Sequence, residues 1–158
     1  VDICRYTMGD IEEVSAYSTR GYMREVAGFS VDDAMVVNAK FASGALATFS
    51  TGCFPLGGHP ESPGGGIGLN LSSRNHSITL SGWNFEGTVH SGEETRETIP
   101  VDENIFYIQN KAFLNAVVQG STSGIHSSYE DGMKTLATTL AANESARNQN
   151  GSPVRVAF

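Results

Sequence analysis

Cysteine is scarce in this sequence, since only Cys4 and Cys53 occur in 158 residues. A chain of this length can bury a hydrophobic core without covalent cross-links, so it does not need the disulfide scaffold of small secreted domains. Two thiols so far apart in sequence fit a reducing compartment better than a secreted framework. We therefore expect a cytoplasmic protein without a structural disulfide.

Long apolar runs and an excess of basic residues are also missing. No stretch approaches the roughly 20 apolar residues that span a bilayer, and residues 1–6 lack the basic-then-apolar pattern of a targeting signal. The 10 lysines and arginines are outnumbered by 17 acidic residues, which gives a formal charge of -7. A chain with this charge repels a phosphate backbone. These absences predict a soluble protein that binds neither membrane nor nucleic acid.

The patterns of common cofactor and catalytic sites are absent as well. No Gly-x-Gly-x-x-Gly links a strand pattern to a helix pattern, so this chain alone is not expected to bind a dinucleotide. The four histidines lack the close spacing of zinc ligands, and no metal site is expected. Asp32 and Asp33 would point to opposite faces of a strand. We therefore interpret them as a solvated loop end rather than an acid–base pair.

What the sequence does contain is a series of short strand patterns followed by two helical ones. Strand alternation bounded by turn residues occurs at 11–18, 33–41, 45–53, 67–71, 76–80, 83–89, 94–100 and 153–158. Helical periodicity occupies 105–119 and about 127–147. We predict a single α+β domain over residues 1–158, with an open, mostly antiparallel sheet of about six to eight strands and two main helices packed on one face.

Both long helices are expected to turn their apolar residues toward the sheet. The first has Asp102 near its start and Gly120 as a C-cap, and Ser127 with Glu130 resembles a capping box that opens the second. The apolar face of the first helix contains Ile105, Ile108, Ala112, Phe113, Ala116 and Val117. The buried face of the second is predicted to contain Met133, Leu136, Ala137, Leu140 and Ala141.

The segment 54–66 interrupts this pattern with three prolines and five glycines in thirteen residues. This composition can continue neither a strand ladder nor a helix, so the segment is predicted to be a long loop. Long loops in compact domains often bind ligands, although a surface loop without a ligand is an equally good interpretation.

The start of the chain looks incomplete. Residues 1–8 read as the last two turns of a helix that Gly9 closes, and no N-cap residue precedes them. We expect the sequence to begin inside a helix, with an upstream part removed.

Five short motifs in this order resemble the C-terminal domain of the Gfo/Idh/MocA family, which includes glucose-fructose oxidoreductase and inositol dehydrogenase. They span almost the whole chain and are Val1-Asp-Ile-Cys-Arg-Tyr-x-x-Gly-Asp-Ile, Val31-Asp-Asp-Ala, Phe41-Ala-Ser-Gly-Ala-Leu-Ala-Thr48, Ala112-Phe-Leu-Asn-Ala-Val, and Ser127-Ser-Tyr-Glu-Asp-Gly-x-Lys-Thr-Leu-Ala with Ala141-Ala-Asn-Glu-Ser145. The resemblance implies a dihydrodipicolinate-reductase-like sheet whose open face serves oligomer contact, as a homodimer or tetramer.

The same resemblance implies an NAD(P)-dependent dehydrogenase of a sugar, cyclitol or related polyol. In the family, a separate N-terminal Rossmann domain holds NAD or NADP, and the substrate lies between the two domains. Asp2 matches the last aspartate of the family motif Asp-x-x-x-His-x-x-Asp, which puts the usual catalytic histidine two residues before Val1. The family's catalytic lysine also lies upstream. The resemblance therefore implies no catalytic residue in this chain, which alone should be inactive.

Five residues are candidates for substrate binding. Asp2 and Arg5 match family positions near the site, although tying the first helix to its surroundings is an equally good role for them. Tyr107 is placed at the pocket border by the same similarity. His59 and Glu61, in the 54–66 loop, could offer sugar hydroxyls a donor and an acceptor, while a surface role remains the alternative.

Two other functions are open at this point. A non-catalytic member of the same lineage could use the pocket for binding or regulation. An independent α+β module could instead present its open sheet face, including residues 45–51, as an interaction surface.

Overall fold

Eight strands form two antiparallel sheets in the part of the chain that the computed structural model describes, residues 1–21, 23, 25–52, 68–82, 86–92, 95–99 and 104–158. The chain divides into unit 1, residues 1–55 with 127–158, and unit 2, residues 56–126. The α+β class with antiparallel pairing predicted from the sequence is confirmed, and its strands are shared equally between two four-stranded sheets. No helix among the described residues is long and apolar enough to cross a membrane.

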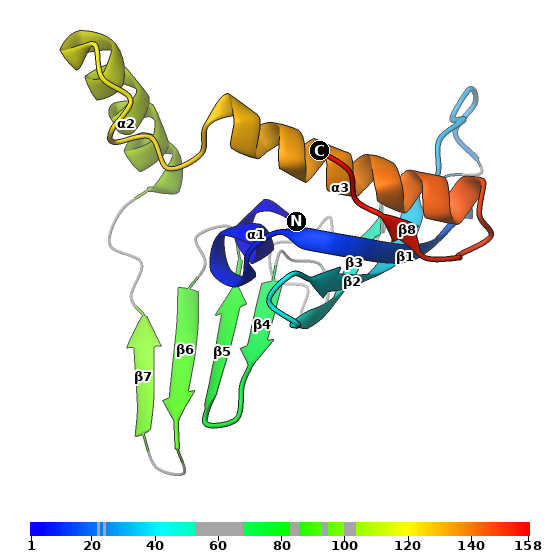
Figure 1. Ribbon diagram of the computed structural model, residues 1–158, viewed down its shortest axis with the longest axis horizontal. Helices are drawn as coiled ribbons and strands as arrows, with labels where there is room; N and C mark the ends of the chain where they lie inside the picture. Colours follow the sequence, from blue (N-terminus) through cyan, green and yellow to red (C-terminus); the bar gives the residue numbers. More distant parts are fainter. Residues whose placement is uncertain (22, 24, 53–67, 83–85, 93–94, 100–103) are drawn as a thin grey trace. The chain divides into compact units, whose positions relative to one another are not determined.

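The sheet of unit 1 has the strand order β3-β2-β1-β8. Its long strands are β1 (Ile11–Thr19), β2 (Ala34–Phe41) and β3 (Leu46–Gly52), and β8 is the short Val154–Arg155. Residues alternate between buried and exposed along β1 and β2, so one face of the sheet is dry and the other is open. Helix α3 (Tyr129–Arg147) runs along the dry face (Figure 1).

Small side chains let α3 approach the sheet closely. Its buried residues are Thr138, Ala141, Ala142 and Ser145. The sheet contributes the larger part of the core, with Ile11, Val14, Ala16, Val37, Ala39 and Phe41 all buried. Ser145 extends the ladder of β1, because its Oγ accepts from the Ala16 N–H at 2.9 Å and donates to the Ser152 carbonyl at 2.7 Å. A helix residue thereby satisfies backbone groups at the strand edge.

The prediction that the large apolar residues of this helix are buried is wrong. Met133, Leu136 and Leu140 are each more than half exposed, whereas Ala141 is buried as predicted. The helix has apolar residues on two opposite faces, and the face with small side chains is the one that lies on the sheet. The helix also begins one residue later than the proposed capping box, because Ser128 Oγ accepts from the Asp131 N–H.

The solvated loop end predicted for Asp32 and Asp33 is wrong, because Asp33 is buried and both carboxylates accept hydrogen bonds from other residues of unit 1. Asp33 is buried and accepts hydrogen bonds from the backbone N–H groups of Gly21 and Met23. Asp32 accepts from Ser18, and it pairs with Arg20 at 3.2 Å and Arg147 at 3.0 Å. The expected solvated loop end is therefore a connection between the ends of β1 and α3.

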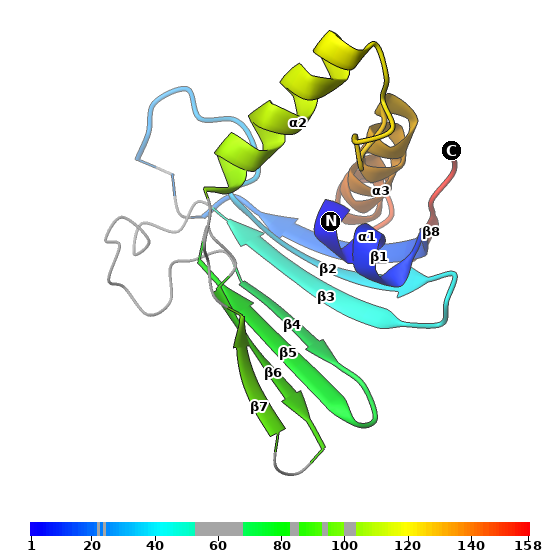
Figure 2. The same cartoon turned by 90° about the vertical axis from the view of Figure 1, so that its left-hand side faces the viewer.

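Unit 2 contains a meander of β4 (Gly68–Ser72), β5 (His76–Ser81), β6 (Glu86–Ser91) and β7 (Thr95–Ile99), in that order across its sheet (Figure 2). It also contains helix α2 (Ile105–Gln119), whose N-cap is Asn104 and whose C-cap is Gly120, as expected. Asp102, which was expected near the start of this helix, lies outside the described residues. No residue of α2 is buried, so its predicted dry face is not covered in this structure.

Candidate functional site

Two motifs that lie more than a hundred residues apart in the sequence meet around Arg5. This residue belongs to helix α1 (Asp2–Met8), which Gly9 ends with a φ of 90°. Its partners come from the first turns of α3 and from the turn between α1 and β1. All of these segments belong to unit 1.

The Arg5 guanidinium is the centre of the cluster. Its side chain is 4% exposed. Nη1 donates to the Asp131 carbonyl at 2.9 Å and to Thr135 Oγ1 at 2.8 Å. Nη2 donates to Asp10 Oδ1 at 2.9 Å and to Asp131 Oδ1 at 2.7 Å. A planar fork of this kind fixes direction as well as distance, so Arg5 holds α1 against α3 in one arrangement.

Two further contacts close the cluster. Lys134 Nζ donates to Asp10 Oδ2 at 2.7 Å, and the same ammonium lies 4.8 Å from the centre of the Phe158 ring. The Thr135 hydroxyl, which accepts from Arg5, donates in turn to Asp2 Oδ1 at 2.9 Å. Asp2 also lies 3.8 Å from Arg5 Nη1. The cluster thus connects the first residues of α1, the start of β1 and the beginning of α3.

Electrostatics hold these groups in their charged forms. Lys134 and then Arg5 lower the pKa of the Asp10 carboxyl through hydrogen bonds, and Arg5 lowers the pKa of Asp131. Burial alone would lower the pKa of Arg5, but the hydrogen bonds that Arg5 donates to Asp131 and Asp10 more than offset this effect and raise that pKa. A carboxylate that stays ionised at neutral pH is a poor proton donor. The cluster is therefore suited to positioning rather than to proton transfer.

The candidate residues from the sequence have different settings. Arg5 is enclosed by the cluster, whereas the Asp2 side chain is 59% exposed and can accept hydrogen bonds from a ligand. Tyr107 lies on α2 in unit 2, exposed, with Lys111 Nζ 5.5 Å from its ring centre. His59 and Glu61 lie outside the described residues. The structure thus brings Asp2 and Arg5 together.

Sequence reasoning missed four members of the cluster, which are Asp10, Asp131, Lys134 and Thr135. Each lies inside a motif that supported the family resemblance, so a signal was present. Nothing in residue spacing, however, predicts that segments around residues 5 and 131 pair with each other. In the residues that the structure describes, no group of three or more potential metal ligands gathers.

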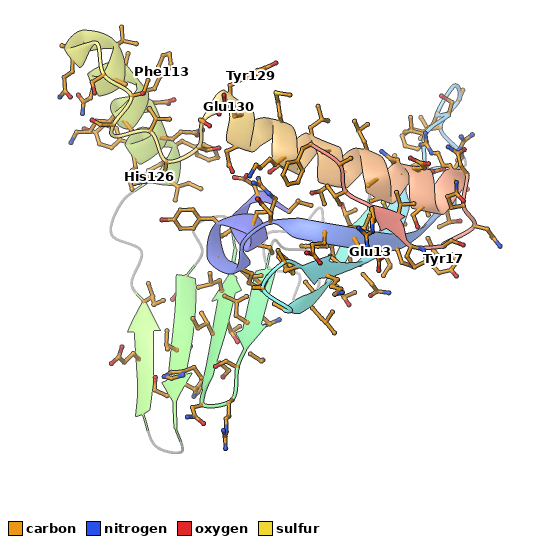
Figure 3. The ribbon with its side chains drawn as sticks, in the orientation of Figure 1. Glu13, Tyr17, Phe113, His126, Tyr129 and Glu130 are labelled. Carbon is orange, nitrogen blue, oxygen red and sulfur yellow. The ribbon has the colours of Figure 1, made fainter. Side chains whose placement is uncertain are left out.

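The open face of the sheet in unit 1 is the second feature of interest. A groove of about 430 Å³ crosses it and is lined by side chains that include Glu13, Ser15, Asn38, Lys40, Leu46 and Thr48. Glu13 and Tyr17 lie on the side of β1 that faces away from α3 (Figure 3). Tyr17, Val36 and Leu46 expose large apolar surface on this face. A polar sheet face with exposed apolar side chains is suited to protein contact.

Comparison with known proteins gives structural matches alone. No protein-family model and no curated protein matches the sequence. Levoglucosan dehydrogenase, solved with NADH and levoglucosan, matches with a TM-score of 0.76 and 19% identity over 100% of this chain and 48% of that chain. The chain has the fold of the C-terminal domain of oxidoreductases such as levoglucosan dehydrogenase.

Two other structures share this C-terminal fold. An oxidoreductase from Agrobacterium radiobacter, in complex with NAD+, L-tartaric acid and magnesium, matches with a TM-score of 0.72 and 20% identity over 98% of this chain and 46% of that chain. Aldose-aldose oxidoreductase from Caulobacter crescentus, complexed with glycerol, matches with a TM-score of 0.71 and 19% identity over 98% of this chain and 44% of that chain. The chain spans just under half the length of these proteins, and the C-terminal fold expected from the sequence is confirmed.

The carboxylates of unit 1 should make this C-terminal fold sensitive to acid. The pKa values of Asp10, Asp131 and Asp32 are all lowered in the folded state. Folding therefore gains stability at pH values above the ordinary carboxyl pKa of about 4, and this gain is lost as the pH falls through the lowered values. We expect a constant free energy of unfolding between pH 7 and about pH 5 and a steep fall below about pH 4 in urea titrations.

Lys134→Met provides the comparison for this pH dependence. Lys134 is the main cause of the lowered Asp10 pKa, so the variant should show a shallower fall in stability below about pH 4. Lys111→Met, which removes an ammonium from the exposed helix α2, should leave the slope unchanged. An unchanged slope in Lys134→Met would contradict the assignment.

Proposed function

We propose that this chain is the substrate-side and oligomerisation domain of an NAD(P)-dependent oxidoreductase of the Gfo/Idh/MocA family, acting on a sugar, cyclitol or related polyol. The observation that carries the proposal is the match of 98–100% of this chain to just under half of several oxidoreductases. The sequence motifs support it independently, because the same residues that resemble the family form the Arg5 cluster.

The cofactor belongs, in this proposal, to a second domain outside residues 1–158. Two of the matching proteins were solved with NAD+ or NADH. Among the described residues of this chain, no strand leads through a glycine-rich turn into a helix, the arrangement that holds a dinucleotide phosphate. When bound, the nicotinamide would accept or deliver the hydride. This chain's own residues are left with binding and orienting the substrate.

Asp2 is the residue of unit 1 best placed for that role. A sugar presents hydroxyl groups, which donate hydrogen bonds to a carboxylate, and bonds to a charged acceptor are among the stronger ones. Thr135 and Arg5 hold the Asp2 carboxylate from one side while most of its side chain is exposed. Arg5 contributes by fixing that carboxylate. Tyr107, His59 and Glu61 remain proposed substrate contacts.

The open face of the unit 1 sheet is the proposed oligomer surface, in a homodimer or tetramer. Its groove and its exposed Tyr17, Val36 and Leu46 support this role, since an isologous interface needs one face that can contact a copy of itself. Helix α3 covers the opposite face of the same sheet and leaves this one open.

The test is turnover by the full-length protein that contains this chain. We expect reduction of NAD+ or NADP+ with at least one member of a panel of aldoses, cyclitols and anhydrosugars. Asp2→Asn should raise KM about 10- to 100-fold, the loss of one hydrogen bond to a charged group. Glu144→Gln makes the same charge change on an exposed residue of α3 and should leave KM unchanged.

Other outcomes separate the alternatives. Binding of cofactor and polyol without turnover would favour a non-catalytic member of the same lineage. No binding of NAD(H) or NADP(H) by the full-length protein would overturn the proposal. Turnover with an unchanged KM in Asp2→Asn would remove Asp2 from the substrate site and leave the rest intact.

A further inference from the structure

Side chains on the open face of the unit 1 sheet form rows that cross the strands, because residues opposite one another in the register point to the same side. The first row consists of Arg155, Glu13, Lys40 and Leu46, from β8, β1, β2 and β3. The second row, two residues further along each long strand, consists of Ser15, Asn38 and Thr48. The third row consists of Tyr17, Val36 and Ser50. Along the strands the face therefore changes from charged through polar to partly apolar.

The first row contains two neighbouring charges of opposite sign. Glu13 and Lys40 are directly opposite each other on β1 and β2, and both line the groove on this face. Within the described ranges of the chain, neither of them forms an ion pair within 4 Å. Such a pair is complementary to a surface that presents the same two charges in the reverse order. A second copy of this face, turned over, presents them in that order.

The direction of the two-fold axis decides whether these charges meet. In a contact between identical faces the axis lies in the plane of contact. An axis across the strands keeps each strand over its own copy, so Glu13 does not face Lys40. An axis along the strands and centred on β1 or on β2 brings two glutamates or two lysines together. An axis along the strands between β1 and β2 exchanges these strands, so Glu13 of each copy faces Lys40 of the other.

One other axis would also join opposite charges. If it ran between β1 and β8, Glu13 would face Arg155 of the second copy. Strand β8 is the edge of this sheet and has only two residues, so β2 and β3 would then lie outside the contact. The remaining overlap is too narrow for the roughly 800 Å² that each partner contributes to a stable interface of standard size.

The axis between β1 and β2 also suits the other rows. It places Tyr17, which is 66% exposed, over Val36 of the second copy, and Ser15 opposite Asn38. Leu46 faces the aliphatic stem of Arg155. Two sheets that pack face to face lie about 10 Å apart with their strands within about 30° of each other. A glutamate and a lysine side chain together bridge that distance, so the charge pairs form without distortion of either sheet.

We propose that two copies of this chain pack their open sheet faces about a two-fold axis that runs along the strands between β1 and β2, with Glu13 of each copy bound to Lys40 of the other. This inference rests on the oligomer surface of the proposed function and adds its orientation and the residues that determine it. Each ion pair occurs twice, once on either side of the axis.

The test reverses these charges in the full-length protein and measures self-association by sedimentation velocity across a dilution series. Glu13→Lys and Lys40→Glu should each raise the dissociation constant at least about tenfold, because like charges then meet twice. An equimolar mixture of the two variants should return to within about threefold of the unaltered protein. In the mixture one copy has only lysines at positions 13 and 40 and the other only glutamates, so both pairs form again.

The mixture separates a contact between copies from a pairing inside one chain. Both reversals in a single chain restore opposite charges in either case, and this double variant also shows whether the substitutions allow folding. Recovery on mixing requires that the pairs join two copies. Glu144→Lys makes the same charge change on an exposed residue of α3, which covers the opposite face of the sheet. It should leave the dissociation constant unchanged, and mixing it with Lys40→Glu should not restore association.

Three results would each overturn the inference: single variants that associate as tightly as the unaltered protein, a mixture that does not recover, or an unaltered full-length protein that stays a monomer. If a reversal unfolds the chain, Glu13→Gln keeps the side-chain shape and should still weaken association about threefold to tenfold. Cofactor binding and turnover are measured on the same samples. Recovery on mixing without NAD(H) or NADP(H) binding would sink the proposed function alone, and turnover without recovery would sink only this inference.

Discussion

Arg5→Ala is expected to lower the free energy of unfolding by about 2–4 kcal/mol. The substitution removes four hydrogen bonds and leaves the carboxylates of Asp10 and Asp131 facing each other without their shared cation. Loss of one partner from a buried pair costs more than this, but both carboxylates are partly exposed and water replaces some of the lost interaction. Urea unfolding followed by circular dichroism measures the change.

Arg147→Ala is the matched control. Arg147 also pairs with an aspartate, Asp32, but its side chain is about half exposed. We expect a loss of no more than about 1 kcal/mol there. Arg5→Lys keeps the charge without the planar fork, so its loss in free energy of unfolding should lie between those of Arg5→Ala and Arg147→Ala. A loss in Arg5→Ala no larger than that in Arg147→Ala would show that the cluster does not hold α1 to α3.

Val36→Lys is expected to weaken self-association of the full-length protein by about 100-fold or more. Val36 lies near the middle of the open sheet face, between Tyr17 on β1 and Ser50 on β3. In an interface between identical faces the new charge occurs twice, and two ammonium groups are brought together in a partly dry contact. The monomer tolerates the change because the side chain is already about half exposed.

Gln149→Lys controls for the added charge, because Gln149 is an exposed residue beyond the end of α3. The chain carries a net charge of -7, so an added lysine reduces overall repulsion between copies in both variants. Sedimentation velocity across a dilution series should show that Val36→Lys is a monomer, whereas Gln149→Lys still associates. If that variant and the control sediment alike, another surface forms the oligomer.

The elements themselves could be predicted from the sequence, since alternation and turn residues specify strands locally. Hairpin β2–β3 and the β4–β7 meander occur where the patterns indicated. Which face of a helix is buried was harder to predict. Helix α3 has two apolar faces, and periodicity alone favours the one with Met133 and Leu136. The face that packs on the sheet is instead the one with small side chains. These allow the helix backbone to come close enough for Ser145 to accept a hydrogen bond from β1.

The candidate site was less accessible to sequence reasoning. Asp2 and Arg5 were found through a family resemblance, and their partners Asp131 and Thr135 were not, because an interaction between residues so distant in sequence leaves no local pattern. Arg5 also shows that proximity to a site and contact with a ligand are different properties. Both terminal nitrogens of its guanidinium, Nη1 and Nη2, already donate to groups of the protein itself.

The assembly of unit 1 from residues 1–55 and 127–158 has a consequence for the order of folding. Strands β1 to β3 leave the ribosome early, but α3, which covers their dry face, follows only after all of residues 56–126 have been made. Until then Val37, Phe41 and their neighbours are exposed to solvent, and closing so long a loop is slow. During this interval the nascent chain is most open to aggregation and to chaperone binding. The meander of unit 2, whose contacts are local, can form before α3 has been synthesised.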